Sequence, residues 1–149
     1  MVKSSREGRS SAAFQAATQK AAERLRGAGL RPTRQRVELA GHLFQGPDRH
    51  VTAENLHDEV VKAGIQVSLA TVYNTLHQFT AAGLLRQVIV DAARGYFDTN
   101  TGDHQHFFLE DEGTLIDIPG HEIAVSGVPT PPPGLAVDRV DVVVRVKRA

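Results

Sequence analysis

The fold of this chain is decided by residues 68–79, which read Ser68-Leu69-Ala70-Thr71-Val72-Tyr73-Asn74-Thr75-Leu76-His77-Gln78-Phe79. Ser68 is a typical helix N-cap, and the apolar residues Leu69, Val72, Leu76 and Phe79 fall within an arc of about 80° at roughly 100° per residue. The opposite face carries Thr71, Asn74 and Gln78, with Tyr73 and His77 at its shoulder, and contains no Asp, Glu or Lys. Uncharged donors and acceptors suit base edges and thymine methyl groups in a major groove, so this helix is expected to read DNA.

Three further helices precede this segment and a hairpin follows it. Apolar residues recur at helical spacing over residues 12–28, from Thr33 to Gly46, and from Thr52 to Gly64, with Thr33 and Thr52 as N-caps. After Gly83 the apolar period changes to two, which predicts a β-hairpin with strands over residues 85–90 and 96–98. Helices followed by a hairpin are typical of a winged helix-turn-helix, although a generic small α+β domain has the same order of elements.

The composition limits the class of protein. The chain has 149 residues, of which 41% are hydrophobic, so it forms one domain or two small ones with a real core. No run is long enough to span a membrane. Residues 1–11 are polar and basic without an apolar signal segment, and we expect a disordered leader there. The absence of cysteine excludes disulfides and thiolate zinc sites and fits a cytoplasmic protein.

The charge is distributed unevenly. Residues 1–50 carry 10 Lys or Arg against 4 Asp or Glu, whereas residues 101–149 carry 4 against 8. A basic first third on a neutral chain is expected when one end meets a polyanion, although chance clustering on a solvated helix gives the same count.

The C-terminal third reads as short strands. The predicted elements are strands over residues 104–110, 114–118 and 137–146, a short ordered piece over residues 122–125, and a stiff connector over residues 129–134. Three short strands are marginally stable alone, so a partner subunit is expected to cover their apolar face. The overall prediction is an α+β chain: a leader over 1–11, an N-terminal winged helix-turn-helix domain over 12–98, a hinge over 99–102, and a small C-terminal α/β dimerisation domain over 103–149.

Five side chains are candidate metal ligands: His50, Asp98, His104, His106 and Asp117. His104 and His106 are separated by one residue, so they point to the same side of a strand and converge on a single ion. Imidazole and carboxylate donors without a thiolate suit Fe(II), Mn(II) or Zn(II). The alternative is a pair of solvated surface histidines.

Three stretches carry a family resemblance. Residues 29–36, 50–56 and 68–76 resemble the N-terminal signature, the entry to the second winged-helix helix and the recognition helix of the ferric uptake regulator (Fur) family. The resemblance runs from about Ala21 to Val146. It implies a regulatory metal site at the same five positions, with two aspartates as in peroxide-sensing (PerR-like) members. An ion bound by both halves of the chain would then set their relative orientation.

The chain departs from the family pattern in three places. Leu109 and Glu112 stand where many members have a cysteine pair, so no cysteine-bound structural zinc is expected. Asp103 keeps one ligand of a further metal site, but Arg139 replaces a histidine of that site. Asn74 stands where an arginine is usual, which implies weaker phosphate contact or altered base preference.

Residues 103–112 and 141–145 resemble the Irr-type iron-response branch, in which iron or haem is sensed. Because the chain has no cysteine, haem would be held by histidine alone. The predicted protein is therefore an iron- or haem-responsive regulator that binds an AT-rich palindrome in double-stranded DNA as a homodimer, with pairing into a tetramer left open. A peroxide sensor and a metal-independent winged-helix module are the alternatives. A non-haem iron enzyme with a facial triad competes poorly, so no enzymatic activity is expected.

The predicted DNA contacts combine the uncharged helix face with two basic side chains from the first third of the chain. Arg31 and Arg34 are placed to hold phosphate or enter a minor groove, and the family has a basic residue at the position of Arg31. The complete set is Arg31, Arg34, Thr71, Tyr73, Asn74 and Gln78.

Overall fold

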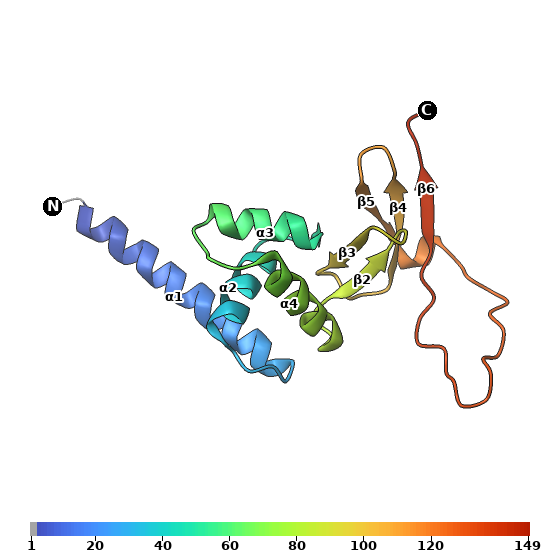
Figure 1. Cartoon of the computed structure of the whole chain (residues 1–149), viewed down its shortest axis with the longest axis horizontal. Helices are drawn as coiled ribbons and strands as arrows, with labels where there is room; N and C mark the ends of the chain where they lie inside the picture. The colour runs from blue at the N-terminus through green and yellow to red at the C-terminus, as the bar shows by residue number, and fades with distance from the viewer. Residues whose placement is uncertain (1–2) are drawn as a thin grey trace.

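The computed structural model describes residues 3–149, with side chains from residue 12 onward. Four helices form one end of the molecule and two three-stranded sheets form the other (Figure 1). In chain order the elements are α1 (Lys3–Gly27), α2 (Arg34–Leu43), β1 (His50–Val51), α3 (Ala53–Lys62), α4 (Leu69–Ala81), β2 (Arg86–Ile89), β3 (Gly95–Asp98), β4 (His104–Leu109), β5 (Thr114–Pro119), the 3-10 turn η1 (Gly120–Glu122) and β6 (Val143–Val146).

The helix boundaries follow from local chemistry. The hydroxyl oxygens of Thr33, Thr52 and Ser68 accept hydrogen bonds from backbone N–H groups three residues later, at 3.3, 3.1 and 3.1 Å. Gly64 and Gly83 follow α3 and α4 with φ of +87° and +81°, a left-handed conformation that glycine adopts without strain. The predicted caps of all three helices and the predicted stops of α3 and α4 are confirmed, whereas α2 ends at Leu43, before the predicted stop at Gly46.

The first helix is longer than predicted. α1 begins at Lys3, so residues 3–11, which the sequence predicts as a disordered leader, have helical backbone, while residues 1 and 2 lie outside the described residues. No proline interrupts the segment, and Gly8 costs a helix interior only about 1 kcal/mol. The helix therefore extends beyond the helical core, and Phe14, an apolar residue within the predicted helical stretch 12–28, is 72% exposed.

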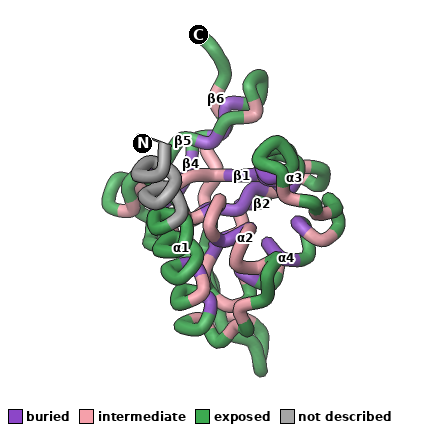
Figure 2. Tube along the Cα trace, turned by 90° about the vertical axis from the view of Figure 1, so that its left-hand side faces the viewer, coloured by how far each residue is buried: buried purple, intermediate pink, exposed green. Residues whose placement is uncertain are grey.

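The main core lies where the helices meet the first sheet (Figure 2). It contains Leu25, Leu39, Leu56, Val72 and Phe79, each at most 1% exposed. The first sheet has the order β1-β3-β2 and supplies the wing, as predicted. β1 was not predicted, because two residues show no periodicity and the strand exists only through its pairing with β3.

The second sheet has the order β5-β4-β6, with β5 antiparallel and β6 parallel to β4. Two boundaries differ from the prediction: the ordered piece after β5 is η1 instead of residues 122–125, and β6 begins at Val143 instead of residue 137. Arg139 is ion-paired with Asp141 and donates a hydrogen bond to the Gln87 carbonyl of the wing. This stretch is therefore held against the wing, and pairing with β4 begins only at Val143. The chain as a whole is α+β, as predicted, but the C-terminal part carries a 3-10 turn and strands where α/β was expected.

A second core joins the wing to this sheet. Val88, Val90 and Tyr96 of the hairpin pack with Phe108 and Leu115 of the second sheet. The Tyr96 hydroxyl also donates to the Gly113 carbonyl at 2.8 Å. The wing thus covers one face of the C-terminal sheet. None of the helices that the structure describes is long and apolar enough to cross a membrane.

Candidate metal centre and DNA-reading helix

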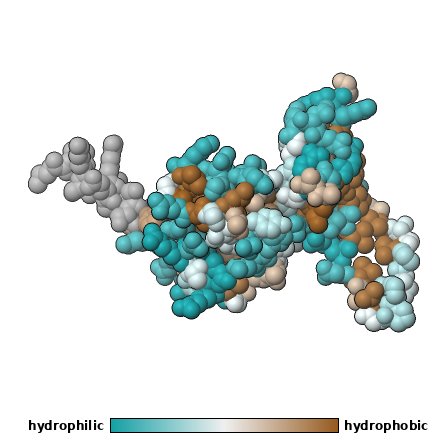
Figure 3. All heavy atoms as spheres, viewed as in Figure 1, coloured by the Kyte–Doolittle hydropathy of each residue, from teal (hydrophilic) through white to brown (hydrophobic). Residues whose placement is uncertain are grey.

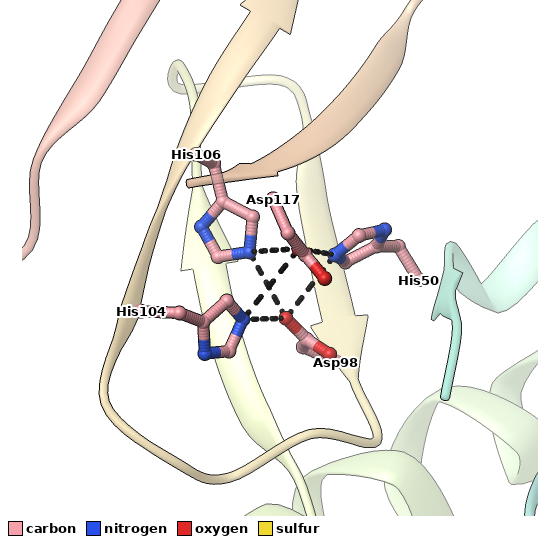
Figure 4. Close-up of side chains that lie close together, drawn as sticks. All are labelled: His50, Asp98, His104, His106 and Asp117. Atoms are coloured by element: carbon pink, nitrogen blue, oxygen red, sulfur yellow. Dashed lines mark hydrogen bonds and ion pairs between the residues drawn. The ribbon is translucent and has the colours of Figure 1, made fainter. Parts of the chain in front are cut away.

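All five predicted ligands meet at one point between the two sheets (Figure 4). His50 comes from β1, Asp98 from β3, His104 and His106 from β4, and Asp117 from β5. One donor atom of each lies within 4.8 Å of the others. The cluster therefore draws two side chains from the winged-helix part and three from the C-terminal sheet.

Strand pairing puts these side chains together. His50 is the Cα partner of Asp98 across β1 and β3, and His106 is the Cα partner of Asp117 across β4 and β5. His104 and His106 are two residues apart on β4, so they project from the same face. The backbone ladders, rather than flexible loops, fix where the donor atoms lie.

Asp98 is at the centre of the cluster. Its Oδ2 lies 2.7 Å from Nε2 of His104, 3.0 Å from Nε2 of His106 and 3.2 Å from Nε2 of His50. Asp117 Oδ1 lies 2.8 Å from Nε2 of His50 and 3.3 Å from Nε2 of His106. With metal–ligand bonds of about 2.1 Å, neighbouring donors around an octahedral ion are about 3 Å apart, so these spacings match the edges of a coordination polyhedron.

The surrounding hydrogen bonds orient the donor atoms toward the centre of the cluster. His104 Nδ1 lies 2.7 Å from the Gly102 carbonyl, which only accepts, so this nitrogen carries the proton and Nε2 is left as a donor for a cation. The Asn100 N–H donates to Asp98 Oδ1 at 2.9 Å, leaving Oδ2 to face the histidines. Hydrogen bonds alone would require a proton on Nε2 of all three histidines, and for His104, whose Nδ1 already carries one, this would make the ring cationic. A cation at the centre requires none of these Nε2 protons. The donor set fits a divalent metal ion.

Burial divides the cluster into a closed and an open side. Asp98 is fully buried and His104 and His106 nearly so, whereas the Asp117 side chain is 47% exposed. Burial raises the pKa of the Asp98 carboxyl, but the hydrogen bonds from His106 and His50 outweigh burial and hold that pKa far below its usual range. Burial lowers the pKa of His50, but the hydrogen bond to Asp98 and the charges of Asp98 and Asp117 raise it overall. The Asp98 carboxyl is therefore negatively charged at neutral pH, and the exposed Asp117 lies at the entrance of the cluster.

The helix that the sequence predicts to read DNA, α4, presents part of its polar face to solvent. Tyr73 is 50% exposed and Asn74 is exposed, while Thr71 is half-buried and accepts from the Ser68 hydroxyl at 2.9 Å. Leu69 was predicted to lie in the core but is 41% exposed. It stands on the first turn of α4, beyond the reach of the core, and lines a surface hollow with Tyr73 and Asn74.

Two predicted DNA contacts already have partners within the chain. Gln78 Oε1 accepts from Arg36 Nη2 at 3.0 Å and from Arg36 Nε at 3.3 Å. Arg34 is 3.2 Å from Glu38, but its side chain is 90% exposed. Arg31 is exposed, and its carbonyl accepts from Arg36 Nη1 at 2.9 Å. Arg36 therefore links the predicted contacts Arg31 and Gln78.

The sequence did not single out Arg36 as part of the DNA-binding surface. The only sequence signal for it was a basic side chain close to Arg34. No local pattern predicts its hydrogen bond to Gln78, which lies 42 positions away. His77, which the sequence places at the shoulder of the uncharged face of α4, packs edge-on between Tyr73 and Phe97, with centroid distances of 4.4 and 5.3 Å. Its Nε2 is buried without a hydrogen-bond partner.

Comparison with known proteins identifies the family that the chain matches. Residues 27–127 match the profile of the Ferric uptake regulator family. The chain is 38% identical over 100 residues to a ferric uptake regulation protein of Pseudomonas aeruginosa, an alignment that covers 66% of this chain and 75% of the relative.

Two solved structures have the same fold. The ferric uptake regulator of Pseudomonas aeruginosa with manganese superposes with a TM-score of 0.65 and 28% identity, over 86% of this chain and 97% of that one. The ferric uptake regulator of Vibrio cholerae superposes with a TM-score of 0.66 and 25% identity, over 85% of this chain and 98% of that one.

Proposed function

Because the chain belongs to the ferric uptake regulator family, and is thus a metal-dependent DNA-binding regulator and not an enzyme, we propose that His50, Asp98, His104, His106 and Asp117 are its regulatory metal ligands. The observation that supports this proposal most directly is that five donor atoms, contributed by both halves of the chain, lie within 4.8 Å of one another. A divalent cation at this point would supply the positive charge that binds two carboxylates and three imidazoles together.

The chain's own residues explain how occupancy affects DNA. His50 and Asp98 lie on the winged-helix sheet, while His104, His106 and Asp117 lie on the sheet assigned to dimerisation. Holding the two sets at contact distance fixes how α4 is oriented relative to the C-terminal sheet. In a dimer this orientation sets the distance between two reading helices, and hence the spacing of half-sites that both can reach.

Within the family we place the chain in the Irr-type iron-response branch, on the strength of residues 103–112 and 141–145. The five donors converge on one point, which favours a bare cation over a porphyrin as the ligand of this site. Fe(II) or Mn(II) suits the mixed nitrogen and oxygen set, and a family member has been solved with manganese. A peroxide-sensing regulator is the second candidate, because two aspartates accompany the three histidines.

The functional unit that we propose is a homodimer on an AT-rich palindrome, in the cytoplasm. The outer face of the C-terminal sheet supports this assignment. Phe107 and Ile116 are paired across β4 and β5 and are 36% and 49% exposed, and Val144 of β6 lies beside Phe107. Apolar atoms gather over this sheet and along the segment before β6 (Figure 3). A second copy would cover them.

The function is tested by DNA-binding titration of chelated protein and of protein loaded with Mn(II), Fe(II) or haem. The double variant His104→Ala/His106→Ala should lose the metal-dependent change in DNA affinity while keeping the wild-type circular dichroism spectrum. His121→Ala, an exposed histidine on η1, is the control and should behave as wild type. Full metal response in the double variant would place the sensor elsewhere, and a response to haem alone would favour a haem sensor over a metal sensor.

A further inference from the structure

A buried arginine lies beside the metal cluster without contributing a donor to it. Arg86, on β2, is 6% exposed and is the Cα partner of the ligand Asp98 across β2 and β3. Its charge is removed from water, which is costly unless partners satisfy it. The positions of those partners show what the side chain connects.

The Arg86 guanidinium joins three segments that are far apart in the sequence. Nη1 donates to the carbonyl of the ligand His104 at 2.8 Å and, more weakly, to the Gly102 carbonyl at 3.4 Å. Nη2 donates to Asp141 Oδ1 at 2.6 Å. The Gly102 carbonyl also receives the Nδ1 proton of His104, so the arginine and the ligand ring share one acceptor.

The contacts continue from Asp141 back to the wing. Arg139 is ion-paired with Asp141 at 2.9 Å and donates from Nη2 to the Gln87 carbonyl on β2 at 3.3 Å. Asp141 stands two residues before β6, the strand that completes the C-terminal sheet. A continuous chain of hydrogen bonds and ion pairs therefore links the ligand His104, through Arg86, to Asp141 just before β6. From Asp141 it returns through Arg139 to the wing strand β2.

We propose that Arg86 is a positioning residue that transmits the state of the metal cluster to the wing and to β6. The inference rests on the proposed function of the cluster and adds the route by which the cluster acts. The orientation of the His104 ring sets the Gly102 carbonyl. Arg86 donates hydrogen bonds to that carbonyl and to the His104 carbonyl, so it moves when they move. Its ion pair with Asp141 then shifts the start of β6, the strand beside β4.

An arginine suits this position for a geometric reason. Its planar fork places separate N–H groups on acceptors in different segments at the same time, which the single ammonium of a lysine on a flexible stem does less well. The Nε proton of Arg86 is buried without a partner, so the side chain is held by its outer nitrogens alone. Because no hydrogen bond from Nε holds the guanidinium in place, a small movement of His104 or Asp141 moves the arginine as well.

The test compares Arg86→Gln with a matched arginine. Arg145 also joins β6 to the wing, through the Val90 carbonyl, and it pairs with Glu110 after β4, but neither partner is a ligand of the cluster. The measured quantity is the ratio of DNA dissociation constants in chelated and Mn(II)-loaded protein. Arg86→Gln should bring this ratio closer to one by about tenfold or more, whereas Arg145→Gln should leave it within about twofold of wild type.

A second readout needs no metal. In chelated protein, amide hydrogen exchange over residues 99–104 should be faster in Arg86→Gln than in wild type and unchanged in Arg145→Gln. If wild type itself shows no metal-dependent DNA binding, the proposed function fails, and the exchange experiment still decides whether Arg86 holds the hinge. Wild-type coupling and wild-type exchange in folded Arg86→Gln would overturn the proposal.

Because Arg86 is buried, two more conservative changes accompany Arg86→Gln as a safeguard against loss of the fold. Arg86→Lys keeps the charge but loses the fork, and Asp141→Asn removes the ion pair at a side chain that is 40% exposed. Each should bring the chelated-to-loaded ratio closer to one by about threefold or more. If both keep the wild-type ratio, Arg86 does not transmit the signal.

Discussion

At the scale of single residues, the buried Asp98 and the half-exposed Asp117 have different positions in the cluster. Asp98 Oδ2 is within 3.2 Å of Nε2 of all three histidines, whereas Asp117 Oδ1 lies 3.7 Å from Nε2 of His104. The first carboxylate is therefore in contact with every imidazole, and the second closes the side that faces solvent.

Asp98→Asn should weaken Mn(II) binding more than Asp117→Asn, and by more than the roughly 10–100-fold that loss of an outer-shell partner costs. Water can replace the exposed Asp117 oxygen but has no access to the position of Asp98. Isothermal titration calorimetry on the two single variants measures the difference. Equal losses of affinity would show that burial does not rank the two ligands.

The raised pKa of His50 predicts a pH dependence of the chelated protein. A histidine whose pKa is higher in the folded chain than the ordinary 6.5 stabilises the fold fully below 6.5, and this contribution is lost as the pH rises through the folded value. Urea unfolding of chelated wild type and His50→Gln should therefore show a stability difference that is largest near about pH 6 and shrinks toward about pH 9. A difference that grows with pH would contradict the charge assignment.

At the scale of elements, α4, the helix that we propose reads DNA, has bounds set by local sequence and surroundings set by tertiary packing. Ser68 and Gly83 determine where the helix begins and ends, so its bounds were predictable from neighbours in sequence. The exposure of Leu69 was not, because the helical period cannot show that the first turn extends beyond the core. The same limit applies to Gln78, whose bond to Arg36 depends on how α2 and α4 pack.

Tyr73→Ala should weaken binding to the specific operator by roughly 1–3 kcal/mol and change binding to unrelated DNA little. The reason is that Tyr73 is half-exposed at the edge of an uncharged face and offers a ring and a hydroxyl, but no charge for phosphate. Fluorescence anisotropy on both DNAs at one salt concentration measures the two losses. Arg34→Ala provides the contrast, because loss of a phosphate contact should weaken both complexes similarly.

At the scale of the whole molecule, the ligand set shows how far sequence reasoning reaches. The His104 and His106 pair was visible from strand periodicity, and the family resemblance added His50, Asp98 and Asp117 to it. The pairing of β1 with β3 that brings His50 to Asp98 was invisible, because two residues carry no strand signal. The role of Arg86 was equally hidden, since its acceptors lie in segments that meet only after folding.

The exposed apolar face of the C-terminal sheet predicts how the oligomer can be broken. Phe107→Glu with Ile116→Glu should convert the dimer to a monomer, because two charges would be buried in an apolar contact. Size-exclusion chromatography with light scattering measures the change. Ile89→Glu, which alters a 66% exposed apolar residue on the wing, should leave the molecular mass unchanged. A dimer that survives the double change would place the subunit contact on another surface.

The apolar contact between the wing and the C-terminal sheet limits how this protein can be divided. Val88, Val90 and Tyr96 lie before residues 99–102, while Phe108 and Leu115 lie after them. A fragment that starts at residue 103 would lack the hairpin half of its own interior and should aggregate instead of folding independently. The two halves are thus poor candidates for exchange between chimaeric proteins, and a graft would have to carry the hairpin along with the sheet.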